Sequence, residues 1–337
     1  MFNFPKIIDK SLKNFIVQKY SNQDSKQWNE FVNHSKNGTF LHNRNFMDYH
    51  SDRFEDYSLI VLENQKWVAI LPANLYNNQI LSHQGLTYGG LLYDEKLKLE
   101  TVILVFQMIL KFLNNNKIEK LILKTIPSIY HKKPAEEINY ALFLVNAKLI
   151  RRDSLSVIDL NKQNKITSGR LEGIKKGAKN NLIIKEENNF ESFWNEILIP
   201  NLKNKFQTNP VHSLEEIILL KSLFPNNIRQ FNVYKNNNIV AGTTIFESNE
   251  VGHSQYISGS ETKSENGSLD FLYHHLITNV FKNKVFFDFG TSNEQQGRKL
   301  NSGLNFWKES FGASTIAHDY YEIETTNFGL LDNILIK

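Results

Sequence analysis

The sequence predicts an α/β protein of two domains that share one internal order, each a mixed sheet flanked by helices. Its 337 residues, of which 41% are hydrophobic and 22% are charged, suit two packed cores of ordinary size. The stretches 61–84 and 233–256, which lie 172 positions apart, show the same succession of strands and Asn-rich turns. In this comparison Ala69 aligns with Ala241. Both the length and the pattern therefore indicate a repeated α/β unit.

Each copy begins with three strands in a meander, continues with a helix, a strand and a second helix, and ends with a closing strand. In the first copy we expect strands at 57–62, 67–75, 79–83 and from 121, with helices at 101–113 and 135–146. In the second copy we expect strands at 229–234, 239–246, 252–257 and 285–290, with helices at 268–281 and 302–309. A further helix precedes each copy, near 25 and near 190. We place the boundary between an N-terminal domain, 1–157, and a C-terminal domain, 158–337.

The composition excludes several kinds of functional site. The absence of cysteine excludes disulfides, thiolate zinc sites and a cysteine nucleophile. The histidines have no partners at metal-ligand spacing, so we expect no metal site. The net charge of +4 is mild, and it fits a local anion-binding site better than a dedicated nucleic-acid binder.

The sequence also lacks the usual signals for export or membrane insertion. Charged residues interrupt the apolar residues of 1–20, and they also interrupt the most apolar stretch, 97–113. We therefore expect a cytoplasmic protein, with peripheral contact with a membrane surface left open.

Five motifs of this sequence resemble a known family. They are SHQGLTYGG (82–90), NPVHSLEEI (209–217), HSQYISGS (253–260), GSLDFLYHHL (267–276) and DFGTSNEQQGRKLNSGLNFWKESFGA (288–313). Together with the Lys-rich start of the second domain, they resemble the FemAB-related acyltransferases, a branch of the GNAT superfamily built from two tandem GNAT-like domains. The resemblance spans nearly the whole chain and implies transfer of an acyl or aminoacyl group to an amino group. The chain departs from the tRNA-using branch because it has no evident long helical coiled-coil insertion.

Such a transfer requires that donor phosphates are held, an oxyanion is stabilised and the attacking amine loses a proton. For the phosphates, the segment 161–185 contains seven basic residues and one acidic residue. Lys175, Lys176 and Lys179 fall in a predicted helix, where Lys175 and Lys179 share a face. These three lysines are candidates for binding the phosphates of a nucleotide-linked or lipid-linked substrate or of a tRNA. The alternative is a solvated helix face.

Two other features bear on phosphate binding. Gly169, Gly173 and Gly177 interrupt the lysine-rich helix and favour a binding role, because a helix that serves only solubility rarely needs three glycines. The segment 260–268 leads into a helix at the place where GNAT domains grip a donor pyrophosphate with backbone N–H groups. Glu261 and Glu265 would repel phosphate there, so an ordinary capped helix start is the better interpretation.

The candidates for proton transfer and oxyanion binding lie near the end of the third meander strand. His83 and Gln255 occupy equivalent positions of the two copies. In GNAT domains this strand splits from its neighbour and offers backbone N–H groups to an acyl oxygen. We take His83 and Tyr256 as candidate catalytic residues, and Gln255 and Tyr88 as candidate substrate-binding residues. For His83 and the tyrosines, the alternative is a structural role with a satisfied polar group.

The last motif supplies a further set of candidates. Asp288 lies in the apolar run 285–290 and is costly to bury unless it is paired, which makes it a candidate catalytic residue. Its alternative role is a hydrogen bond that closes the loop. Ser292, Glu294 and Arg298 follow this strand, at the kind of edge where α/β sheets bind ligands, and are candidates for substrate binding.

We therefore expect an acyltransferase that acts on an amine of a cell-envelope precursor, either an amino sugar or a peptide. The precursor would be nucleotide-linked or lipid-linked. No cofactor is expected to be tightly bound, and acyl-CoA, an acyl carrier or aminoacyl-tRNA would be the donor. The active site is expected in a cleft between the domains, faced by His83 and the loop 291–298. The alternative is a non-catalytic GNAT-fold protein that binds a precursor or a partner.

Overall fold

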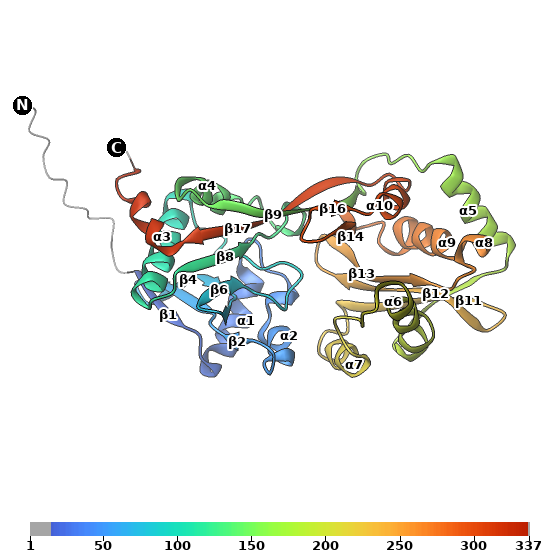
Figure 1. The fold of residues 1–337 in the computed structure, drawn as a ribbon, viewed down its shortest axis with the longest axis horizontal. Helices are drawn as coiled ribbons and strands as arrows, with labels where there is room; N and C mark the ends of the chain where they lie inside the picture. Colours follow the sequence, from blue (N-terminus) through green and yellow to red (C-terminus); the bar gives the residue numbers. More distant parts are fainter. Residues whose placement is uncertain (1–14, 336–337) are drawn as a thin grey trace, which may run out of the picture. The chain divides into compact units, whose positions relative to one another are not determined.

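The chain forms two compact units in the computed structural model, which describes residues 15–335 (Figure 1). One unit contains the chain up to Ile150 and again from Asp319 onward, and the other contains Arg151–His318. The predicted domains, 1–157 and 158–337, differ from these units in two respects. The change of unit falls earlier, inside β9 (Lys148–Asp159), and the C-terminal segment rejoins the first unit. It does so because residues 320–324 of β17 (Ser314–Glu324) pair with β8 (Lys120–Lys124).

The first unit contains two groups of paired strands. A four-stranded sheet has the order β1 (Phe15–Lys19), β3 (Leu59–Glu63), β4 (Lys66–Leu71) and β7 (Leu92–Tyr93). The second group has the order β17, β8, β6 (Gln79–Ser82), β5 (Asn74–Tyr76) and β2 (Glu55–Asp56). The helices are α1 (Ser25–His34), α2 (Arg44–Met47), α3 (Leu99–Asn115) and α4 (Glu137–Leu144). Short 3₁₀ turns lie at Asn22–Asp24, Phe40–His42, Asp48–His50, Ser128–Tyr130 and Thr325–Leu331.

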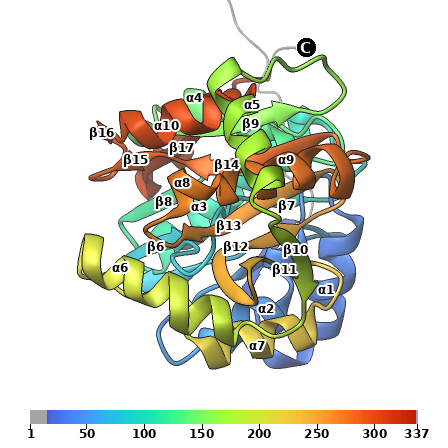
Figure 2. The same cartoon turned by 90° about the vertical axis from the view of Figure 1, so that its right-hand side faces the viewer.

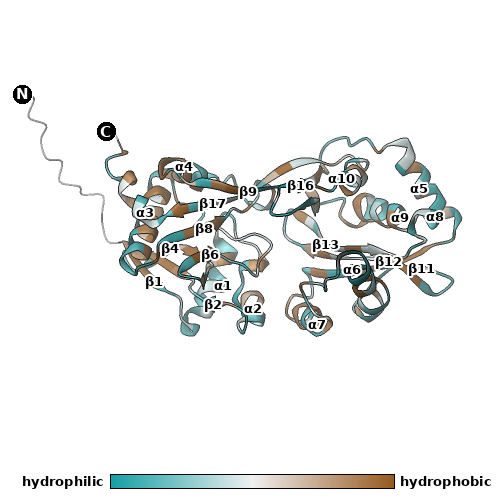
Figure 3. Ribbon diagram, viewed as in Figure 1, coloured by the Kyte–Doolittle hydropathy of each residue, from teal (hydrophilic) through white to brown (hydrophobic). Residues whose placement is uncertain are grey.

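The core of the first unit forms around α3, because apolar residues recur on one side of this helix at three- and four-residue intervals. They include Val102, Val105, Phe106, Ile109 and Leu113, all buried. The strands of each unit also contain apolar residues (Figure 3). Among residues 15–335, no helix combines the length and the apolar character needed to cross a membrane. The segment 1–14, on which the expected lack of an export signal partly rests, lies outside the described residues.

The second unit is a sheet with helices packed against it. Its strand order is β10 (Ile183–Glu187), β11 (Ile228–Lys235), β12 (Asn238–Glu247), β13 (Val251–Gly259), β14 (Phe286–Thr291) and β9. A separate hairpin is formed by β15 (Asn293–Glu294) and β16 (Lys299–Leu300). The α-helices are α5 (Ser168–Lys179), α6 (Ile199–Phe206), α7 (Leu214–Leu223), α8 (Lys263–Asn266), α9 (Ser268–His275) and α10 (Ser302–Glu309). Two π-helical segments, Phe193–Leu198 and Leu276–Val280, precede α6 and follow α9.

The predicted meander is confirmed in the second unit, where β11, β12 and β13 pair in sequence order. In the first unit it is wrong. The expected strand 67–75 is two strands, because β4 ends before Pro72 and β5 begins after it, and the two belong to different sheets. Proline has no N–H to donate to a sheet ladder, whereas Thr244, the equivalent residue of β12, pairs within its sheet.

The Asn-rich turns have the backbone conformation that tight hairpins require. Asn77 and Asn78 have φ of 49° and 58°, and Asn236 and Asn237 have φ of 49° and 66°. Asparagine tolerates this left-handed region better than most residues, and two such residues in succession fit the right-handed twist of the flanking strands. Together, the helices and the mixed sheets of the two units confirm the predicted α/β class, with mixed sheets flanked by helices.

Candidate active site

The central feature of the second unit is an opening between two parallel strands. β13 and β14 pair over only three positions, which join Val251 to Phe286, Gly252 to Phe287 and His253 to Asp288. Beyond His253, β13 continues to Gly259 along β12, whereas β14 reaches Thr291, which is opposite Leu155 of β9. The third meander strand therefore separates from its parallel neighbour, as the resemblance implies.

A bulge lies at the same place in β13. Ser254 is opposite Ile245 and Tyr256 is opposite Thr244, so the half-buried Gln255 has no residue across from it on β12. A bulge changes the direction of the backbone and occurs often beside active sites. The predicted residues Gln255 and Tyr256 thus lie where β13 changes direction and leaves β14.

Asp288 lies at the last position where β13 and β14 pair, which is where this opening begins. Its side chain is 1% exposed, accepts a hydrogen bond from the Gly290 N–H at 2.7 Å, and lies 2.9 Å from Nδ1 of His253. Gly290 has a φ of 71°, in the left-handed region that favours glycine, so the loop turns where the Asp288 carboxylate receives its N–H. These contacts fit the loop-closing role, and a catalytic role for Asp288 stays a prediction.

Lys308 is a buried residue of this site that the sequence argument missed. Its side chain is 1% exposed, and its ammonium donates to the carbonyl oxygens of Gly290 at 2.9 Å and Thr291 at 2.7 Å. Burial lowers the pKa of Lys308 to about 8, while the Asp288 carboxylate opposes this change. A lysine inside the run NFWKESF is the available sequence signal, because lysine is rarely buried without a partner.

The other predicted residues of the last motif lie beyond this loop. Ser292 is buried, and its hydroxyl has no hydrogen-bond partner in the described part of the chain. Glu294 and Arg298 are exposed and belong to the β15–β16 hairpin and its turn. Glu294 accepts a hydrogen bond from the Asn301 amide at 3.2 Å. Their substrate-binding roles stay predictions.

Tyr256 contacts a histidine that comes from another predicted motif. Its hydroxyl lies 2.6 Å from Nδ1 of His212 and accepts the His212 backbone N–H at 3.1 Å. Its ring packs edge-on against Trp194, with ring centres 5.2 Å apart. The next residue, Ser213, caps α7, and its hydroxyl accepts the N–H of Glu216. The motif 209–217 therefore starts a helix and holds Tyr256 in place.

The lysine-rich helix is α5, and Lys175, Lys176 and Lys179 are exposed on it. Two of its glycines have a packing role instead of the binding role inferred from the sequence. A Cβ added at Gly173 would lie 1.9 Å from Oδ2 of Asp270, and one added at Gly177 would lie 2.4 Å from Cβ of Phe271. Both contacts are with α9, which lies alongside α5 (Figures 1 and 2).

This packing covers the start of α9, where a GNAT domain would grip a pyrophosphate. A Cβ added at Gly267 would lie 2.2 Å from the Gly173 carbonyl oxygen, and Ser268 is fully buried. The Ser268 N–H is also taken, since it donates to Oδ1 of Asn266 at 3.0 Å. The start of α9 is therefore enclosed, although it lacks the side-chain N-cap expected for 260–268.

In the first unit, His83 follows β6 and lines a pocket of about 450 Å³. Gly85 N–H donates to its Nδ1 at 3.1 Å, so the proton of the neutral ring lies on Nε2. Burial lowers the pKa of His83 to about 3, and His50 and Lys124 add to this effect. Such a ring is a hydrogen-bond donor at Nε2 and a weak base. This geometry favours a His83 that donates a hydrogen bond over the predicted His83 that accepts a proton. The catalytic role of His83 stays a prediction.

Tyr88 belongs to the interior of the first unit. Its hydroxyl donates to Oγ1 of Thr39 at 3.0 Å, and its ring lies 4.3 Å from that of Tyr130. It does not line the pocket that contains His83. These contacts match the packing alternative. The expected cleft between the domains also stays a prediction.

Comparisons with known proteins support the fold. No family model matches the sequence, and no curated protein matches it either. Among solved structures, FemX matches with a TM-score of 0.66 at 8% identity, covering 94% of this chain and 99% of FemX. L-PGS from Bacillus licheniformis matches with a TM-score of 0.58 at 11% identity, covering 94% and 95%. The C-terminal domain of a putative lysylphosphatidylglycerol synthetase from Agrobacterium fabrum matches with a TM-score of 0.55 at 10% identity, covering 89% and 91%. The chain thus shares the fold of FemX, in line with the resemblance of its motifs.

Proposed function

We propose that this protein transfers an acyl or aminoacyl group to an amine of a cell-envelope precursor, which is an amino sugar or a peptide. The observation that most supports this is the opening between β13 and β14, with the bulge at Gln255 beside it. A GNAT-like domain uses this opening to present backbone N–H groups to an acyl oxygen, where they stabilise the negative charge that develops. FemX, L-PGS and the domain of a putative lysylphosphatidylglycerol synthetase share the fold and are consistent with aminoacyl transfer.

The proposed reaction needs no covalent intermediate with the protein. The neutral amine attacks the acyl carbonyl carbon, a C–N bond forms, and the bond from that carbon to the donor oxygen or sulfur breaks. The leaving oxygen or sulfur takes up the proton that the amine releases. Lys308 acts as a positioning residue, because it fixes the loop carbonyls next to the Asp288 end of the opening.

For the donor, we favour aminoacyl-tRNA over acyl-CoA. Coenzyme A needs a pyrophosphate site, and the α9 start that would supply it is buried under α5. A tRNA instead needs a basic surface, which the exposed Lys175, Lys176 and Lys179 can provide. Acyl-CoA as the donor is the outcome that the test below distinguishes from aminoacyl-tRNA.

For the acceptor, we propose a nucleotide-linked or lipid-linked precursor, with the reaction taking place in the cytoplasm where charged tRNA is available. A lipid-linked acceptor would bring the protein into peripheral contact with a membrane. One structural neighbour is the C-terminal domain of a putative lysylphosphatidylglycerol synthetase, a name that denotes an enzyme whose product is a lipid.

A transfer assay tests the function directly. The full chain is incubated with a mixture of aminoacyl-tRNAs or with acetyl-CoA as donor. The acceptor is a nucleotide-linked amino sugar or a nucleotide-linked peptide, and the masses of the products are measured by mass spectrometry. We expect an aminoacyl adduct of an acceptor with the tRNA donors and no acetyl adduct with acetyl-CoA. Acetyl transfer would overturn the donor assignment. Binding of donors without transfer would favour the non-catalytic alternative.

Two sets of variants sharpen this assay. Lys308→Met keeps most of the side-chain volume but removes the ammonium, and it should lower turnover by about 10²-fold because the loop shifts. His83→Gln retains both an N–H donor and an acceptor for Gly85, whereas His83→Ala retains neither. If His83 donates a hydrogen bond, His83→Gln should keep the activity that His83→Ala loses. If His83 accepts the proton of the amine, both variants should lose activity.

The donor assignment also makes a prediction about α5. Lys175→Glu combined with Lys176→Glu should weaken tRNA binding at least tenfold without changing the melting temperature, because exposed lysines contribute little to stability. Binding by the unaltered protein should also fall steeply as salt is added. The matched control is Lys66→Glu with Lys98→Glu, in the first unit. Equal affinity of the α5 variant and the control would show that the lysines form only a solvated face.

A further inference from the structure

The pocket beside His83 has a chemical character that the proposed transfer does not explain. It lies wholly within the first unit and has a volume of about 450 Å³. The residues that determine its polarity are Tyr20, Arg44, Asp48, His50, Asp56 and His83. These residues come from the segments 20–56 and from the end of β6.

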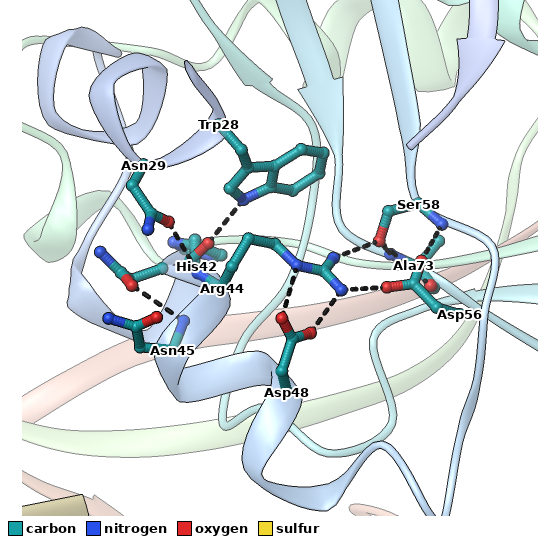
Figure 4. Close-up of polar contacts among 10 residues, drawn as sticks. Trp28, Asn29, His42, Arg44, Asn45, Asp48, Asp56, Ser58 and Ala73 are labelled. Atoms are coloured by element: carbon teal, nitrogen blue, oxygen red, sulfur yellow. Dashed lines mark hydrogen bonds and ion pairs between the residues drawn. The ribbon is translucent and has the colours of Figure 1, made fainter. Parts of the chain in front are cut away.

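Two carboxylates and one guanidinium meet at this pocket. The Arg44 side chain is 3% exposed and forms ion pairs with Asp48 and Asp56, whose side chains are 42% and 35% exposed (Figure 4). Arg44 also donates from Nη1 to Oγ of Ser58 at 3.2 Å and stacks 3.8 Å from the centre of the Tyr20 ring. The Arg44 donors are directed at protein acceptors. The one guanidinium and the two carboxylates together carry a net charge of −1.

One buried side chain of the pocket has no hydrogen-bond partner in the described part of the chain. It is His50, whose two ring nitrogens are unpaired and whose residue is 1% exposed. Nε2 of His50 packs against Gly85, since a Cβ added there would lie 1.9 Å from it. Nδ1 is therefore on the side of the ring that faces away from Gly85. Burial lowers the pKa of His50 to about 4, so the ring is neutral at pH 7 and can accept a hydrogen bond.

The geometry points to a binding site for a primary ammonium group, held by Asp48 and Asp56 with His50 as an additional acceptor. A net negative charge favours a cation, and partly exposed carboxylate oxygens are strong acceptors for N–H groups. Nε2 of His83 carries a proton and can donate to a carbonyl or hydroxyl oxygen of the same ligand. The ligand class is therefore a small molecule with an ammonium next to an oxygen acceptor, which both an amino sugar and an aminoacyl group provide.

An anionic ligand fits the pocket less well. A phosphate would need free cationic donors, but Arg44 is paired with two carboxylates. A phosphate would also approach those carboxylates closely, which is repulsive. The ammonium assignment depends only on contacts within the first unit, so it holds whether or not the proposed transfer takes place.

Calorimetric titration of the full chain tests this site with matched charged and neutral probes. Glucosamine and N-acetylglucosamine form one pair, and alaninamide and N-acetylalaninamide form the other. We expect the amine of at least one pair to bind at pH 7 and its N-acetyl counterpart to bind at least tenfold more weakly. The stronger-binding amine identifies the source as amino sugar or aminoacyl group. Equal binding of the charged and neutral probes, or no binding by either amine, would overturn the inference.

Variants locate the binding within the pocket. Asp48→Asn keeps an acceptor for Arg44 but removes the net charge, and it should weaken amine binding by about ten- to hundredfold. The control is Asp52→Asn, because Asp52 is 80% exposed and does not line the pocket. Equal affinities of the two variants would contradict the assignment. His50→Phe provides a second measurement that does not disturb Arg44, and it should weaken binding about tenfold without lowering the melting temperature.

Discussion

Lowering the pH from 7.5 to 5 is expected to destabilise the first unit by roughly 6 kcal/mol. Burial lowers the pKa of His42 and His50 to about 4 and that of His83 to about 3, against an unfolded value of 6.5. The unfolded chain therefore binds protons below pH 6.5 that the folded unit does not bind until about pH 4. Each histidine then costs about 2 kcal/mol of stability at pH 5, and this loss disappears as the pH rises through 6.5 toward 7.5.

Amide hydrogen exchange measures this loss separately in each unit. At pH 5, after correction for the intrinsic exchange rate, the slowest amides of α3 and β4 should exchange through unfolding that is far more frequent than at pH 7.5. The variant His50→Phe removes one of the three groups and should reduce the acid-dependent loss by about a third. A first unit with equal stability at both pH values would contradict the buried, neutral state of these rings.

Replacing Asp288 with alanine is expected to destabilise the second unit by about 3–5 kcal/mol. The change removes the acceptor for the Gly290 N–H and the partner of His253, and it leaves the buried Lys308 without its nearby negative charge. Asp288→Asn keeps the side-chain acceptor for Gly290, so its cost should be clearly smaller.

Urea unfolding of both variants, followed alongside transfer activity, separates the two roles of Asp288. If the residue closes the loop, stability and activity should fall together in Asp288→Ala, and Asp288→Asn should recover most of both. If Asp288 instead acts on the reacting groups, Asp288→Asn should fold normally yet lose turnover. A stable Asp288→Ala variant would be evidence against the structural account.

The sequence predicted best those elements whose signals are local. The helix 302–309 coincides with α10, because its apolar spacing and the Asn301 cap both lie within one short segment. The Asn-rich turns likewise determine their hairpins by themselves. Pro72 was also a local signal, but the similarity to the uninterrupted second copy led us to expect one strand where the chain forms two.

The candidate site was predicted less well, because its features depend on partners that are distant in the sequence. Nothing near Gly173 or Gly177 indicates that α9 packs against them. Lys308 interacts with carbonyl groups 17 and 18 residues away, and Arg44 pairs with a carboxylate 12 residues away, beyond a short helix and a 3₁₀ turn. Local patterns do not specify such pairings.

The return of β17 to the first unit has a consequence for biosynthesis. Residues 320–324 pair with β8, which leaves the ribosome about 200 residues earlier than they do. Until then, β8 can pair with β6 on one side while its other side exposes unpaired backbone groups. A nascent or truncated chain that ends before residue 320 therefore presents an open strand edge, and such an edge promotes aggregation unless a chaperone covers it. The first unit is thus completed only after the whole of the second unit, Arg151–His318, has been synthesised.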